Sequence, residues 1–305
     1  MFQLRLLSRT AIVALLGLTV GCGGGGDEIA NLVITAQNAE TSASQGVGAV
    51  DMLMSMGDLV DDFSDSIENQ GALLIPCDEG NVNIGVTDVG LQQVLSTGDS
   101  VTVDFQACSF VDDDTVMNGG MSFTATEVTD LGGGMFTLSL TVQFSALTIV
   151  NDEGTMVVNG GFTSTLSSAD GVTLRQVISG SNFSVFGEGD GEVFSGSIRG
   201  FSLVREIDTG DDGFLVDFDA TVSGGNLNGQ LVYNTTIPFE GTGDGDPQTG
   251  SMIVRGANGG TITMVMTGEG NVDLLIDFDG DNTTDLTLPT TWDELTDDEI
   301  SGSDL

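Results

Sequence analysis

From residue 76 to residue 288 the chain alternates apolar and polar residues, and this pattern constrains the fold more than any other feature. Every second position of 136–144 is Phe, Leu or Val, and the positions between them are Thr, Ser or Gln. A period of two places the apolar set on one face of a β-strand and the polar set on the other. The same alternation occurs at residues 101–105, 121–125, 156–162, 172–174, 216–222, 231–233, 262–266 and 272–278. We therefore predict at least ten strands, each with one buried and one solvated face.

The segments between these strands favour an antiparallel arrangement. They are short and rich in Gly, Asp and Asn, as at 151–154 and 208–213, which is typical of turns. The alternation changes parity near Ala146 and at Gly200, where β-bulges would bend the sheet. Glycines that follow a small polar residue recur at intervals too irregular for a solenoid. The predicted fold is mainly β, a long antiparallel meander that forms an open roll or half-barrel, and a parallel β-helix is the alternative.

Ahead of the strands, the spacing of apolar residues changes to that of a helix. Residues 47–69 carry apolar side chains three or four positions apart, with aspartates between them and Gly71 in a stopping position. The preceding residues 29–43 are moderately apolar and are also expected to be helical. We expect this helical segment, 29–75, to pack on the apolar face of the β domain, 76–288. The apolar positions are Val47, Val50, Leu53, Met56, Val60, Phe63 and Ile67.

The first 28 residues indicate export and a lipid anchor. Arg5 and Arg9 precede an apolar run at 11–20, which is too short to span a membrane but suits a secretory signal, so 1–21 is the predicted signal peptide. Residues 19–22 resemble a bacterial lipobox, which implies acylation of Cys22; ordinary cleavage after Gly21 with a free thiol is the alternative. Residues 22–28 then form a Gly-rich linker. The resemblance favours the outer membrane, because no Asp follows Cys22 directly.

Composition excludes several classes of function. The chain has 46 acidic residues, six arginines and no lysine or histidine, and its net charge of −40 repels nucleic acid. Without histidine or lysine it cannot form a Ser-His-Asp relay or a Schiff base. One Trp and one Tyr cannot supply the aromatic girdles of a membrane barrel. Hydrolysis by two carboxylates is the main enzyme chemistry left. Glu188 with Glu192, or Asp217 with Asp219, are pairs to consider, but no spacing fixes two carboxylates at catalytic separation, so no catalytic residue is predicted.

Two further cysteines follow the anchor candidate. In an oxidising compartment Cys77 and Cys108 are the natural pair once Cys22 is acylated. A redox-active role is the weaker alternative, since their spacing is not C-x-x-C.

A cation site is predicted near the end of the strand region. Asp277, Asp279, Asp281 and Asp285 occupy positions 1, 3, 5 and 9 of a turn, a spacing that can gather hard oxygen ligands around Ca²⁺. Asn282 and Leu288 replace the Gly and Glu of the strict EF-hand pattern, and an acidic hairpin turn without an ion is the alternative. The sequence indicates no other cofactor. Downstream, 289–305 is predicted to be a short helix, N-capped by Thr291, followed by an acidic tail.

Several of these pieces together resemble a family of uncharacterised outer-membrane lipoproteins of Gram-negative bacteria. The resemblance rests on Cys22 with four glycines after it, on the Cys77 and Cys108 stretches, and on the 277–285 loop followed by Thr-Trp-Asp-Glu-Leu at 291–295. It implies an exported lipoprotein that contacts the membrane through its lipid, and it supplies no activity. We favour a non-enzymatic binding or structural module with an envelope partner. A carrier or chaperone of an apolar ligand and a carboxylate-dependent polysaccharide hydrolase are the alternatives.

Overall fold

The computed structural model describes residues 31–70, 77–89, 95–110, 113–151, 154–189, 192–210, 212–224, 227–243 and 245–296. The predicted signal peptide, Cys22, the linker, residues 71–76 and the tail from 297 lie outside this part. So do the side chains of 59–70, which include the predicted apolar positions Val60, Phe63 and Ile67. Two α-helices, a 3-10 turn and thirteen strands make up the regular structure of the described residues.

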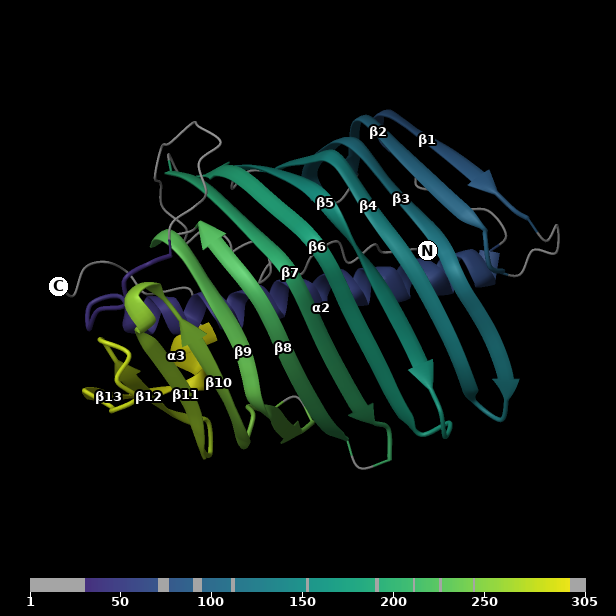
Figure 1. Ribbon diagram of the computed structural model, residues 1–305. Helices are drawn as coiled ribbons and strands as arrows, with labels where there is room; N and C mark the ends of the chain where they lie inside the picture. Colours follow the sequence, from purple (N-terminus) through teal and green to yellow (C-terminus); the bar gives the residue numbers. More distant parts are fainter. Residues whose placement is uncertain are drawn as a thin grey trace.

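Thirteen strands form one sheet in which each strand pairs with the next along the chain (Figure 1). Every pairing is antiparallel, which confirms the predicted meander and excludes the parallel β-helix. The first and last strands do not pair with each other, so the sheet stays open. The strands are β1 (Glu79–Thr87), β2 (Ser100–Phe110), β3 (Asp113–Gly132), β4 (Met135–Asn151), β5 (Gly154–Ser168), β6 (Thr173–Gly189), β7 (Glu192–Asp208), β8 (Gly213–Gly224), β9 (Leu227–Thr242), β10 (Thr249–Arg255), β11 (Thr261–Gly268), β12 (Asn271–Asp277) and β13 (Leu286–Thr291).

Bulges in neighbouring strands give the sheet its curvature. The register shifts after Phe144 in β4 and after Arg199 in β7, the two places where the sequence changes parity. At the β4 bulge Ala146 has a φ of 46°, and its N–H donates to Asn159 Oδ1 at 2.9 Å. Gly160, which follows Asn159 on β5, has a φ of 100°, and a Cβ there would overlap the backbone of β6. Gly160, one of the glycines that follow a small polar residue, therefore lies beside a bulge.

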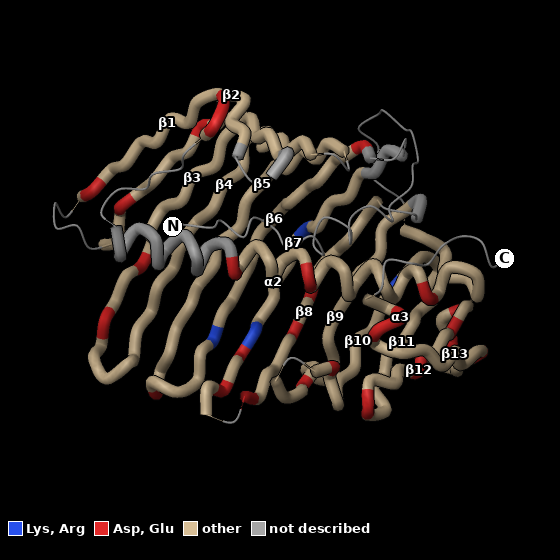
Figure 2. Tube along the Cα trace, turned by 180° about the vertical axis from the view of Figure 1, so that it is seen from behind, with Lys and Arg blue, Asp and Glu red and all other residues tan. Residues whose placement is uncertain are grey.

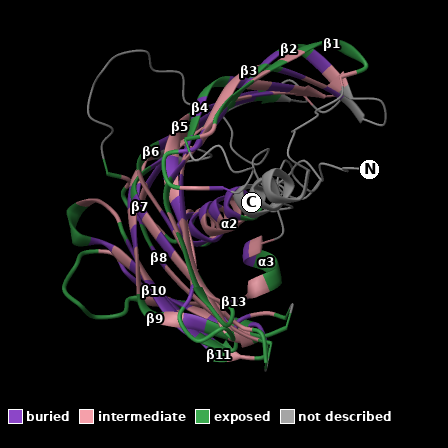
Figure 3. Cartoon of the chain, turned by 90° about the vertical axis from the view of Figure 1, so that its right-hand side faces the viewer, coloured by how far each residue is buried: buried purple, intermediate pink, exposed green. Residues whose placement is uncertain are grey.

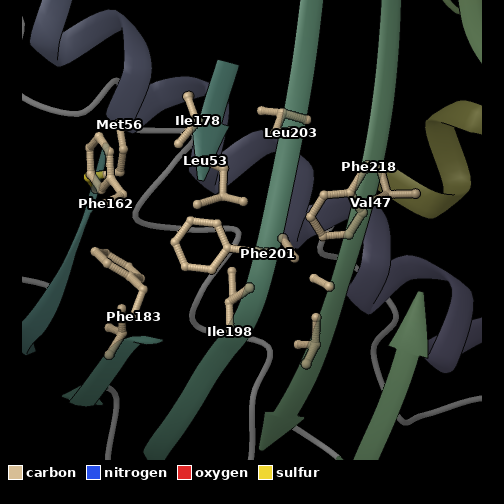
Figure 4. Packing of buried hydrophobic residues seen from close by; sticks show 14 of the residues in the cluster. Val47, Leu53, Met56, Phe162, Ile178, Phe183, Ile198, Phe201, Leu203 and Phe218 are labelled. Carbon is tan, nitrogen blue, oxygen red and sulfur yellow. The ribbon is translucent and has the colours of Figure 1, made fainter. Parts of the chain in front are cut away.

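Helix α2 (Ala39–Gln70) crosses the concave face of this curved sheet (Figure 3). Its buried positions follow helical spacing, and Figure 4 shows Val47, Leu53 and Met56 among apolar side chains of the central strands. Because α2 begins at Ala39, the helix starts earlier than its clearest periodicity predicted, and residues 31–38 are not helical. Met56 is 5% exposed, and Met52 and Met54 pack partly buried against the core.

The opposite, convex face is polar. Hydroxyl side chains meet there across neighbouring strands, with Ser139 and Thr165 at 2.9 Å and Ser197 and Ser223 at 2.8 Å. Figure 2, in which α2 lies in front of the sheet, shows acidic positions spread over the helix, the strands and the turns, with few arginines among them. Within the described part of the chain, no helix has the length and apolarity needed to cross a membrane.

Two covalent or capping features hold the ends of the fold. The disulfide between Cys77 and Cys108 joins the start of edge strand β1 to β2, with the Cα atoms 5.2 Å apart. At the other end, α3 (Trp292–Thr296) has the predicted capping box: Glu294 N–H donates to Thr291 Oγ1 at 3.2 Å, and Thr291 N–H donates to Glu294 Oε2 at 2.9 Å. Its Leu295 is buried, and the carbonyl of Leu295 accepts a hydrogen bond from Ser44 of α2.

Candidate functional site

The turn between β12 and β13 gathers three of the four predicted cation ligands. Asp277, Asp279 and Asp285 each offer a carboxylate oxygen, and these oxygens lie within 4.8 Å of one another. Asp277 is the last residue of β12 and is 7% exposed, whereas the other two are exposed. Asp281 is not part of this group, and its Oδ1 accepts a hydrogen bond from Thr283 N–H at 2.7 Å.

Backbone N–H groups hold this turn in shape. Asp277 Oδ1 accepts from Gly280 at 2.7 Å and Asp277 Oδ2 accepts from Asn282 at 2.8 Å. Asp285 Oδ2 accepts from Phe278 N–H at 2.9 Å, which closes the turn from its other side. Asn282 has a φ of 66°, so the residue in place of the expected Gly does adopt the left-handed backbone.

The electrostatics of Asp277 favour the ionised form. Burial by itself raises the pKa of this carboxyl, but hydrogen bonds from the backbone N–H groups of Gly280, Asn282 and Asp279 outweigh burial and lower the pKa. Each oxygen of an ionised carboxylate can accept more than one interaction, so the N–H contacts do not exhaust the group. Three carboxyl groups with convergent oxygens are a donor set that fits a hard cation such as Ca²⁺.

The concave face, where an apolar ligand would bind, is filled by the protein itself. The residue at position 46 of α2 lies so close to β9 that an added Cβ would be 2.4 Å from Cε1 of Tyr233. Further along the same helix, a Cβ added to Gly57 would be 2.6 Å from Ile178 Cδ1 on β6. Backbone and side chains are in direct contact at both places.

Inward-facing side chains of other strands are buried as well. Val103 on β2, Val142 on β4 and Phe162 on β5 are 2% exposed or less, and Met264 on β11 is fully buried. Aromatic rings fill the space between strands, with Phe144 and Phe183 in an edge-to-face arrangement at 5.9 Å between centroids. The concave face is therefore a packed core from β2 to β12.

Polar groups on this face belong to the contact between helix and sheet. Arg205 of β7 donates to Asp58 of α2 at 3.1 Å, an ion pair that the sequence did not reveal because the two residues are far apart in the chain. Asp51, predicted on the solvated side of the helix, is half-buried, and burial raises its pKa to about 6. Tyr233, which is fully buried, donates its hydroxyl to the carbonyl of Ser42 at 2.8 Å.

Of the two carboxylate pairs considered for hydrolysis, only Asp217 and Asp219 both lie among the described side chains. Asp217 and Asp219 lie two positions apart on the same face of β8, the face opposite buried Phe218 and Ala220. Burial and the neighbouring charge of Asp219 raise the pKa of Asp217. Asp219 accepts a hydrogen bond from Asn234 at 2.9 Å. Glu188 is exposed, and the side chain of Glu192 lies outside the described residues.

The contact between the start of the described chain and the sheet was not predicted. Leu32 N–H donates to the carbonyl of Gln230 at 3.0 Å, and the Leu32 carbonyl accepts from Ala257 N–H at 2.6 Å. Gly229 and Gly256 lie against Leu32 with no room for a Cβ. The only signal in the sequence was the pair of glycines, which a turn would explain equally well.

The chain matches no protein-family model, no curated protein and no solved structure.

Proposed function

We propose that this protein is a lipid-anchored, non-enzymatic binding or structural module of the cell envelope, held at the outer membrane through Cys22. The observation that favours this module over a carrier of an apolar ligand is the packing of α2 on the concave face. An apolar ligand would need the space that α2 occupies, and Gly46 on Tyr233 and Gly57 on Ile178 leave none at those contacts. The convex face, rich in hydroxyl groups, and the turns at both ends of the sheet are the surfaces available to a partner.

The anchor part is supported by the sequence of residues 19–22. Asn31 follows Cys22 by nine residues and is fixed at one end of the sheet. Several acyl chains on one cysteine would bind a membrane stably, since each buried CH₂ contributes about 0.8 kcal/mol. Retention would then depend on Cys22 alone.

The test is fractionation of a Gram-negative host that expresses the full chain, combined with mass spectrometry of the mature N-terminus. We expect an acylated Cys22 at the N-terminus and protein in the outer-membrane fraction. Cys22→Ser should release the protein from the membrane. The matched control, Cys77→Ser with Cys108→Ser, removes two cysteines without touching the anchor and should stay in the membrane. A membrane-bound Cys22→Ser variant, or an unmodified Cys22, would refute the proposal.

A second function, calcium binding, is favoured by the convergence of Asp277, Asp279 and Asp285. We propose that these three carboxylates hold Ca²⁺ as a structural ion between β12 and β13. The melting temperature should rise with added CaCl₂ and return after chelation, because a ligand that binds only the folded state stabilises it. Asp285→Asn should abolish the rise, and Asp293→Asn, an exposed carboxylate outside the turn, should preserve it. No shift in the unmodified protein at millimolar Ca²⁺ would refute this function.

A further inference from the structure

The residues that follow the proposed tether are fixed to one end of the sheet. Asn31 forms an isolated parallel bridge with Gln230, whose side chain also donates to Asn31 Oδ1 at 2.8 Å. Leu32 hydrogen-bonds to both Gln230 and Ala257, and Ile34 is 2% exposed. We call this end, marked by residues 256–260 between β10 and β11 and residues 278–285 between β12 and β13, the clasped rim. The opposite rim is marked by the end of β9 at Thr242 and by residues 269–270 between β11 and β12.

The tether is short compared with the height of the sheet. Asn31 is nine positions after Cys22, a distance of at most about 30 Å for a fully extended chain and about 16 Å for a Gly-rich random coil. From Gln230, β9 continues twelve residues to Thr242 at the opposite rim, a length of about 40 Å. If the opposite rim contacted the membrane, Asn31 would lie further from the acylated Cys22 than a relaxed tether reaches.

We propose that the clasped rim faces the phospholipid surface that carries the anchor, and that the opposite rim points away from it. This inference rests on the proposed anchor at Cys22. The contacts of Asn31 and Leu32 with Gln230 and Ala257 set the orientation because they shorten the free chain. Without these contacts, the tether would extend to the start of α2 at Ala39. Affinity for lipid is not the cause, because the clasped rim carries the aspartates of the 277–285 turn and anionic headgroups would repel them.

The orientation has a further consequence for a partner. In this orientation the convex, hydroxyl-rich face runs parallel to the membrane normal. The opposite rim, with its turns after Asp208 and Thr242, is the part of the described protein most distant from the bilayer. A partner that reaches the module from the aqueous side therefore meets the opposite rim first.

The experiment measures the height of each rim above a bilayer. The full acylated chain is reconstituted into phosphatidylcholine vesicles that contain acceptor-labelled headgroups, and a donor dye is attached at Thr284→Cys on the clasped rim or at Thr242→Cys on the opposite rim. Both threonines are exposed, and the two native cysteines of the domain are joined in the disulfide. Energy transfer from position 284 should exceed that from position 242 about twofold or more, because the rims stand roughly one long strand apart.

Two further variants separate the causes. Gly256→Val places a side chain where Leu32 O lies 2.4 Å from an added Cβ, so it should detach the clasp and bring the two transfer efficiencies together. Insertion of a Gly/Ser segment after Gly26 should do the same without touching the domain. Equal transfer in the unmodified protein, or stronger transfer from position 242, would overturn the orientation. Failure of the protein to float with the vesicles would instead overturn the anchor, and with it the orientation.

Discussion

The contact between α2 and Tyr233 leads to a prediction with its own internal control. Gly46 and Gly48 lie two residues apart in the same helix. A Cβ at Gly46 would be 2.4 Å from Tyr233 Cε1 and 3.2 Å from Met252 Cε, whereas a Cβ at Gly48 would meet nothing within 4 Å. Alanine at either position raises helix propensity by about 1 kcal/mol. The propensity gain therefore cancels when the two variants are compared, and only the overlap remains.

The overlap can be estimated from the structure. An ordinary contact needs at least 3.4 Å, so helix and ring must separate by about 1 Å in Gly46→Ala, and overpacking of this kind costs about 1–3 kcal/mol. Tyr233 cannot turn aside freely, because it is fully buried and its hydroxyl bonds to Ser42. Gly48→Ala should raise the free energy of unfolding by about 0.5–1 kcal/mol, and Gly46→Ala should lie about 1–3 kcal/mol below it.

The assay is urea unfolding followed by far-UV circular dichroism at fixed ionic strength, which compares the midpoints at equal m-value. Replacing the ring removes the obstacle, so in a Tyr233→Leu background the two alanine variants should agree within about 0.5 kcal/mol. Equal midpoints for Gly46→Ala and Gly48→Ala in the unmodified background would refute the reasoning. The helix would then not rest on the sheet in this register.

Three other predictions concern charge, the edge strand and the last helix. Burial raises the pKa of Asp51 from 3.8 to about 6. This carboxyl therefore destabilises the fold progressively between pH 3.8 and pH 6, and by up to about 3 kcal/mol above pH 6. The urea midpoint of Asp51→Asn should match that of the unmodified protein near pH 3.5 and exceed it at pH 7, and a difference that does not change with pH would contradict this. Cys77→Ala with Cys108→Ala opens a loop closed by residues 31 apart in sequence, which should lower the free energy of unfolding by roughly 3.5 kcal/mol on the chain-entropy account. Amide hydrogen exchange should become faster first in β1, and faster exchange spread evenly over the sheet would contradict a local role. Thr291→Ala removes the acceptor of the Glu294 N–H and should cost about 1 kcal/mol, while Thr284→Ala in the exposed turn should cost nothing measurable by the same urea assay.

The sequence predicted the architecture because strand periodicity is a local property. Alternation over 136–144 and its repeats specified strands with one apolar face, and short polar turns specified antiparallel neighbours. The parity changes at Ala146 and Gly200 located two bulges, since one extra residue must move every later side chain to the other face. The Thr291 capping box was readable because its partners are three residues apart.

The candidate cation site was predicted in part for the same reason. Asp277, Asp279 and Asp285 converge within one turn, so sequence spacing approximates distance in space. Spacing could not show that Asp281 turns to Thr283 N–H instead, because the direction of a side chain depends on the backbone angles of the turn. The Cys77–Cys108 pair followed from a count of cysteines and an expected compartment.

What the sequence by itself determined is the antiparallel meander with its clearly alternating strands, the helix on its apolar face and the charge, all of which depend on residues close together in the chain. Only the tertiary structure decided that Gly46 of α2 lies against Tyr233, that Arg205 meets Asp58, and that Leu32 is held between Gln230 and Ala257. These contacts join residues separated by about 150 to 225 positions. They depend on how far the sheet curves, which is a sum of small bends along thirteen strands and is not encoded in any one segment.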